Sequence, residues 1–177
     1  MKIKVQILFS LILIFSCKQQ DNRKKITKLS DFNLSTDYIE YKTRMSENDT
    51  INVFVNHSIC TYQGYERIKI INKRDSLKII DEYLEKTYDK HPEWKSAFIK
   101  TISKNDTIWN FEHFLKINER RTISDDKKHG RIQVSYKHDT IHYYSYGLID
   151  ALKFMEEYNR LMVKLYPLYL KDSFGLQ

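Results

Sequence analysis

Alternating apolar and polar positions predict several half-buried β-strands along this chain. The apolar positions of three such stretches are Ile51, Val53 and Val55; Trp109, Phe111, Leu115 and Ile117; and Ile132, Val134 and Tyr136. A further strand is predicted over residues 65–71, which are rich in β-branched side chains. Residues 94–102 fit either a strand or a helix, and we interpret them as a strand. One apolar face per strand is typical of antiparallel sheets.

A recurring triplet predicts the turns. It occurs as Asp49-Thr50-Ile51, Asp106-Thr107-Ile108 and Asp139-Thr140-Ile141, at spacings too unequal for a repeat protein. Asp tolerates turn conformations, whereas Thr and Ile favour strands. We therefore expect three β-hairpins, which pair 38–45 with 50–58, 96–103 with 107–117, and 131–137 with 140–146.

Two amphipathic helices are predicted. The first begins at Asp75 or Ser76 and ends at His91-Pro92, and the second follows Gly147 and ends before Pro167. Their apolar stripes are Leu77, Ile80, Leu84 and Tyr88 in the first, and Leu148, Ala151, Leu152, Met155, Tyr158, Met162 and Leu165 in the second. The expected fold is α+β: an antiparallel sheet of hairpins with both helices on one face, in a single domain over residues 37–177.

The N-terminus has the pattern of a secretory signal. Lys2 and Lys4 precede an uncharged apolar run over residues 7–15, and Ser16-Cys17 follows. A helix that crosses a bilayer needs about 20 apolar residues, so this run is too short to span one. The alternative is an N-terminal core element, which the flanking lysines and the polar segment after the run disfavour.

The residues Ile14-Phe15-Ser16-Cys17 resemble the lipobox of bacterial lipoproteins. The resemblance implies a signal peptide over residues 1–16 and a Cys17 that carries acyl chains such as palmitate. Residues 17–36 would then form a polar, lipid-anchored linker, whose lysines and arginine either contact anionic lipids or only keep it solvated. Lys18 replaces the aspartate of the family's inner-membrane retention signal, which implies the bacterial outer membrane, on its periplasmic or its outer surface.

The charge of the chain is concentrated in these N-terminal segments. The formal net charge is +7 and the isoelectric point is about 9.2. From Asp31 onward, however, 23 basic residues face 22 acidic ones. Nucleic-acid binding needs a basic face on the fold. The charge therefore predicts no nucleic acid as a partner. The partners that the lipobox resemblance implies are a membrane, through the lipid anchor, and a protein of the cell envelope.

Recognisable catalytic and cofactor motifs are missing from the sequence. Four scattered glycines exclude the phosphate-binding loops, and the common serine-hydrolase and zinc-protease motifs are absent. His138 and His142 are the best-spaced metal ligands, but a turn is predicted between them. We predict no metal, no cofactor and no catalytic activity. His113 is expected in the core, and Cys60 as a small buried apolar residue.

Tyrosines form the candidate binding surface. Alternation places His142, Tyr144 and Tyr146 on one face of a strand, to which Tyr62 and Tyr65 are added because tyrosine is enriched at interfaces. The alternative places Tyr143 in the core and the others under a loop or helix. The Asp-Thr-Ile triplets also resemble acceptors for O-linked glycans on exported bacterial proteins, which would make Thr50, Thr107 and Thr140 attachment points.

These observations favour a membrane-anchored lipoprotein that presents a small, non-catalytic binding or structural domain. One alternative is an immunity lipoprotein that neutralises a toxin, since such a protein would be equally small and tethered. A second alternative is an envelope hydrolase, which would need a deep pocket lined by titratable groups with shifted pKa values.

Overall fold

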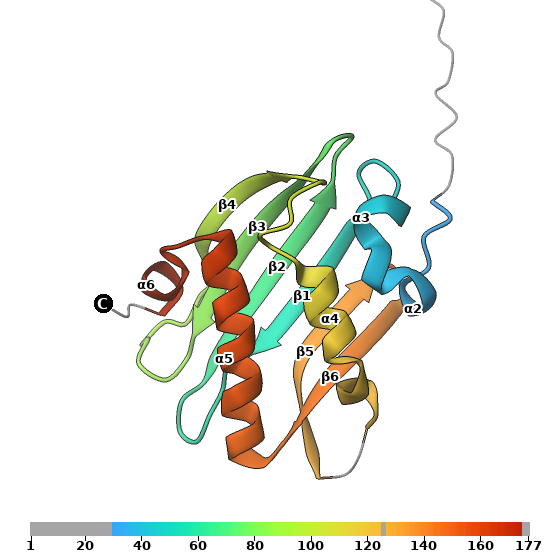
Figure 1. Ribbon diagram of the computed structural model, residues 1–177. Coiled ribbons are helices and arrows are strands. Elements are labelled where there is room, and N and C mark those ends of the chain that lie inside the picture. The colour runs from blue at the N-terminus through green and yellow to red at the C-terminus, as the bar shows by residue number, and fades with distance from the viewer. Residues whose placement is uncertain (1–29, 125–126, 175–177) are drawn as a thin grey trace, which may run out of the picture.

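The computed structural model describes residues 30–124 and 127–174 (Figure 1). Cys17, the signal peptide and the linker up to residue 29 lie outside these residues. Phe32 and Leu34, from the end of the predicted linker, are buried against the core. No helix within the described part of the chain is both long and apolar enough to cross a membrane.

Six antiparallel strands form one open sheet, in the order β4-β3-β2-β1-β5-β6. The strands are β1 (Thr50–Asn56), β2 (Gly64–Asn72), β3 (Ser76–Glu85), β4 (Lys95–Ser103), β5 (Lys128–Tyr136) and β6 (Asp139–Tyr146). The first four follow one another as a meander, after which the chain crosses over so that β5 pairs with the free side of β1. The α+β fold class is confirmed.

The helices lie on one face of this sheet (Figure 1). They are α2 (Leu34–Asp37), the 3₁₀ helix η1 (Tyr38–Glu40), α3 (Tyr41–Arg44), α4 (Phe111–Ile117), the 3₁₀ helix η2 (Glu119–Thr122), α5 (Gly147–Leu165) and α6 (Tyr169–Phe174). Phe154, Tyr158 and Met162 of α5 are fully buried, as is Val55 of β1. Burial of this apolar layer between helices and sheet supplies the main favourable free energy of folding.

The prediction of the first helix is wrong, because residues 76–85 form strand β3. Leu77, Ile79 and Tyr83 are buried at every second position, although Leu77, Ile80 and Leu84 also fit a helical stripe. Hydrogen bonding to β2 on one side and β4 on the other decides in favour of the strand. The second predicted helix is confirmed as α5, and residues 95–103 are confirmed as a strand.

Of the three predicted hairpins, only the one formed by β5 and β6 is confirmed. Residues 34–44 are helical, and β1 pairs with β2 and β5 instead. Residues 111–117 form α4, whose first turn is capped where the Asn110 side chain accepts a hydrogen bond from the His113 backbone N–H, 3.0 Å away. The triplet that begins at Asp106 does form a turn, because the Asp106 side chain accepts a hydrogen bond from the backbone N–H of Trp109 at 2.8 Å. It introduces a helix there and not a strand.

Two further expectations about single residues are corrected. His113 is exposed, because the helix turns it away from the core that Phe111 and Phe114 enter. Cys60 is also exposed, with a free thiol. It occupies the turn between Ile59 and Tyr62 with a φ of 53°, and a turn at the surface leaves its side chain in solvent.

Candidate ligand-binding pocket

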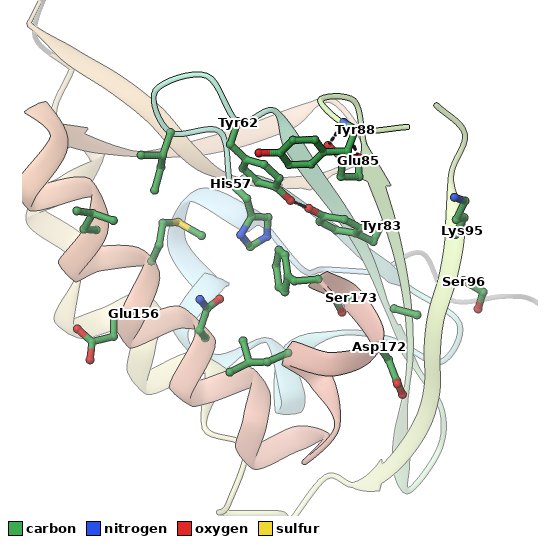
Figure 2. A pocket seen from close by; sticks show the side chains of 17 residues that line it. His57, Tyr62, Tyr83, Glu85, Tyr88, Lys95, Ser96, Glu156, Asp172 and Ser173 are labelled. Carbon is green, nitrogen blue, oxygen red and sulfur yellow. Dashed lines mark hydrogen bonds between the residues drawn. The ribbon is translucent and has the colours of Figure 1, made fainter. Parts of the chain in front are cut away.

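A cavity within the described residues lies between α5, α6, the adjoining ends of β3 and β4, and the turn after β1 (Figure 2). Its volume is about 850 Å³, within the range of roughly 300–1,000 Å³ that is typical of small-molecule sites. The apolar part of the wall is formed by Ile59, Ala97, Leu152, Met155, Leu170 and Phe174. A ligand with an apolar body could therefore be enclosed here.

Tyrosines form one side of this pocket. Tyr62 and Tyr83 point toward one another and their hydroxyl groups form a hydrogen bond, with Tyr88 nearby (Figure 2). Gly64, at the start of β2, permits this arrangement, because a Cβ there would lie 2.6 Å from the Tyr62 hydroxyl and closer still to that of Tyr83. Burial, and then the negative charge of Glu85, raise the pKa of Tyr62 to about 12, so the phenol stays neutral.

The charged side chains of the pocket are mainly acidic. Glu85, Glu156 and Asp172 are among its lining residues, against a single lysine, Lys95. The Lys95 Nζ lies 2.7 Å from Asp89, which neutralises it. Glu156 is paired in the same way with Arg160, so the net negative charge that the pocket presents to a ligand comes from Glu85 and Asp172.

A buried polar cluster lies beneath the pocket. His57 is on the pocket wall and only 6% exposed, and its Nε2 lies 2.7 Å from Glu66 Oε2; we assign the proton of this hydrogen bond to Nε2. The Tyr169 hydroxyl donates to the same oxygen at 2.9 Å. Burial, and then the charge of Arg131, lower the pKa of His57 to about 3. The imidazole is therefore neutral, and its Nε2 tautomer is fixed by Glu66.

Asp81 extends this cluster along the sheet. Glu66 pairs with Tyr83 and Asp81 with Ile68, so the two carboxyl groups are two positions apart on the same face of β2 and β3. Burial, and then the nearby Glu66, raise the pKa of Asp81 to about 10, and burial raises that of Glu66 to about 7. The pair therefore holds a proton at neutral pH, because two like charges this close in a buried site repel each other.

Two polar atoms of the pocket wall have no hydrogen-bond partner among the described residues. They are the Asn159 Oδ1 of α5 and the Ser173 Oγ of α6. Ser173 is only 5% exposed. A buried polar atom without a partner is unfavourable by about 1–3 kcal/mol, so both atoms are candidates for contact with a ligand.

The structure does not gather the predicted tyrosine surface into one site. Tyr62 lines the pocket, whereas Tyr65 stacks on Phe54 on the face of the sheet away from the helices, with ring centroids 5.8 Å apart. His142 and Tyr144 line a separate, smaller hollow of about 380 Å³ near Tyr38, and Tyr146 is 59% exposed. Strands β1 and β5 separate Tyr65 from the β6 residues.

Other predicted site residues are placed as follows. Tyr143 is fully buried, in agreement with the predicted alternation of β6. Thr107 and Thr140 are exposed and Thr50 is half-buried, and their glycosylation remains a prediction. Within residues 30–124 and 127–174, no three His, Cys, Asp or Glu side chains are arranged to hold a metal ion.

Local sequence patterns do not single out His57, Glu66 and Asp81 as a cluster. A signal for Glu66 was present, because the alternation that turns Ile68 and Ile70 inward also turns Glu66 inward. Asp81 could not be recognised in the same way, since the pattern of its segment predicts a helix.

Comparison of the chain with family models, with curated proteins and with solved structures finds no match in any of the three.

Proposed function

We propose that this chain is an envelope lipoprotein whose domain binds a small molecule with an apolar body and does not transform it. The observation that carries the proposal is the pocket of about 850 Å³, whose apolar walls surround a few unpartnered polar atoms. This combination is typical of ligand sites. Acylation of Cys17 would hold the pocket at the outer membrane, where exported molecules and membrane components are its available ligands.

A pocket-filling variant tests this proposal. Ala97 is half-buried on the pocket wall, whereas Thr101 lies on the same strand, is exposed, and does not line the pocket. We expect Ala97→Phe to displace the ligand and Thr101→Phe to leave it bound. The full chain is purified from its own membranes in mild detergent and examined by native mass spectrometry for a bound non-protein mass.

A dye-binding experiment tests the pocket even if its natural ligand is lost during purification. Nile red, a neutral apolar fluorophore, is added to the three proteins at matched detergent concentration, so that partitioning into micelles cancels. More emission from the parent and Thr101→Phe than from Ala97→Phe supports the proposal. Equal emission from all three, with no bound mass on any of them, refutes it.

An envelope hydrolase is the second candidate function, and the contact between His57 and Glu66 is what favours it. A carboxylate that holds one nitrogen of a histidine is the arrangement that orients a general base. The pKa of about 3 argues against this role, since a general base works best when its pKa is near the working pH. In the described part of the chain, His57 also has no hydrogen bond to a hydroxyl or thiol nucleophile. Ester hydrolysis that is lost in His57→Gln, with the fold intact, would favour the hydrolase.

A further inference from the structure

We propose that the pocket selects a protonated amine carried on an apolar or aromatic body. This inference rests on the proposed function and specifies the class of its ligand. It stands on three features of the wall: a carboxylate beside exposed aromatic surface, acceptors that lack donors, and the absence of a free cation among the described lining residues.

Glu85 and the tyrosines form the first feature. Glu85 lies close enough to Tyr62 to raise the pKa of that phenol, and its carboxylate also accepts the backbone N–H of Tyr88 at 3.0 Å (Figure 2). Both tyrosine rings and the carboxylate thus meet at one side of the pocket. Ammonium groups are attracted to the faces of aromatic rings and to carboxylates, and both attractions strengthen as water is excluded.

Asn159 and Ser173 form the second feature. Asn159 Oδ1 is an acceptor without a donor. Ser173 is only 5% exposed, and its Oγ has no hydrogen-bond partner either. An ammonium group carries only donors and could satisfy one of these oxygens. A ligand that carries only acceptors would leave Asn159 Oδ1 unpaired.

The distribution of positive charge is the third feature. Lys95 is the only lysine or arginine among the described lining residues, and Asp89 already holds its ammonium group. His57 is neutral, because Glu66 accepts its Nε2 proton and burial disfavours a charged ring. An anionic ligand would therefore enter a negatively charged pocket with no free cation to meet it, which is unfavourable.

Three probes with the same indole body test the inference. Tryptamine carries a cation at pH 7, tryptophol is neutral, and indole-3-acetate is an anion. Each is titrated by calorimetry into the full chain in lipid nanodiscs, with empty nanodiscs subtracted. We expect tryptamine to bind at least tenfold more tightly than tryptophol, with indole-3-acetate weakest.

A charge variant locates the preference. Glu85→Gln keeps an acceptor for the backbone but removes the charge, so we expect the tryptamine preference to fall to about threefold or less. Glu157→Gln is the matched control, because Glu157 is exposed on α5 and does not line this pocket. An unchanged preference in Glu85→Gln would overturn the assignment of the cation to this wall.

The remaining outcomes separate this inference from the proposed function. Equal affinity for the three probes, or tightest binding of indole-3-acetate, overturns the amine and leaves a ligand pocket. Failure of all three probes while Ala97→Phe still reduces Nile red emission also overturns only the amine. Failure of the probes together with equal Nile red emission from parent and variant overturns both.

Discussion

At the scale of single residues, the unusual feature of this protein is a pair of carboxyl groups on the buried face of a sheet. Glu66 and Asp81 are both fully buried. A buried carboxylate is unfavourable unless it is paired or hydrogen-bonded, and protonation is the alternative. Glu66 receives hydrogen bonds from His57 and Tyr169, so it is better placed to carry the negative charge, and Asp81 is better placed to keep the proton.

Asp81 predicts how stability depends on pH. Its pKa in the folded state, about 10, lies above its ordinary value of 3.8, so the folded protein holds a proton that the unfolded chain releases. Stability therefore falls as the pH rises through this window, by at most about 1.4 kcal/mol per pH unit. Between pH 7 and 9, Glu66 and His57 add little to the slope, because their folded pKa values are about 7 and about 3.

Replacement of the Asp81 carboxyl group by an amide isolates the contribution of its ionisation to the pH dependence of stability. We expect Asp81→Asn to flatten the fall in unfolding free energy between pH 7 and 9 and to be more stable than the parent at pH 9. Urea unfolding at several pH values measures this. Asp75→Asn, a change at an exposed loop position, should keep the parent's slope. A parent protein with constant stability over this range would contradict the assignment of the proton.

At the scale of elements, the pocket depends on how closely the turn after β1 approaches β3. Gly64 begins β2 and follows this turn, and its missing side chain lets the phenols of Tyr62 and Tyr83 meet. The sequence predicted β2 but gave no reason to single out this glycine. Close approach of segments from different parts of the chain is a tertiary property, and periodicity within one strand does not contain it.

Gly64→Ala tests this contact. The new methyl group overlaps both tyrosine hydroxyls, so we expect the unfolding free energy to fall by about 1–3 kcal/mol and the pocket to change shape. Gly130→Ala is the control, since its Cβ would meet only a Tyr144 ring carbon at 3.9 Å. Thermal unfolding compares the two. An equal effect of both substitutions would mean that loss of glycine flexibility, and not the tyrosine contact, determines the result.

At the scale of the whole molecule, the N-terminal segment and the pocket together define the proposed function. The tether would place the protein at a membrane, and the pocket would select what it binds there. Two features of the described residues support this view: an apolar cavity and a mainly acidic set of charged lining residues. The anchor itself is a prediction from the sequence, because Cys17 lies outside the described residues.

Acylation is tested by exchange of the thiol for a hydroxyl. We expect Cys17→Ser to abolish labelling with fatty acid and to release the protein from membranes, because two or more acyl chains are needed for stable attachment. Cys60→Ser should remain acylated and membrane-bound, since Cys60 is an exposed thiol of the folded domain. Membrane fractionation and metabolic labelling give the readout. A parent protein without an acyl label would disprove the anchor.

The sequence by itself determined the α+β class, the strands β1, β2, β5 and β6 and the long helix α5, whereas it left β4 open between strand and helix and offered the inward position of Tyr143 as one of two alternatives. These features follow from local periodicity and turn chemistry, which a single segment contains. Tertiary structure decided that residues 76–85 form a strand, because two neighbouring strands bond to it. It also decided the pocket and the polar cluster beneath it, because His57, Glu66, Asp81 and Asn159 come from four different elements or loops. Their pKa shifts and unpaired atoms arise only when folding removes them from water together.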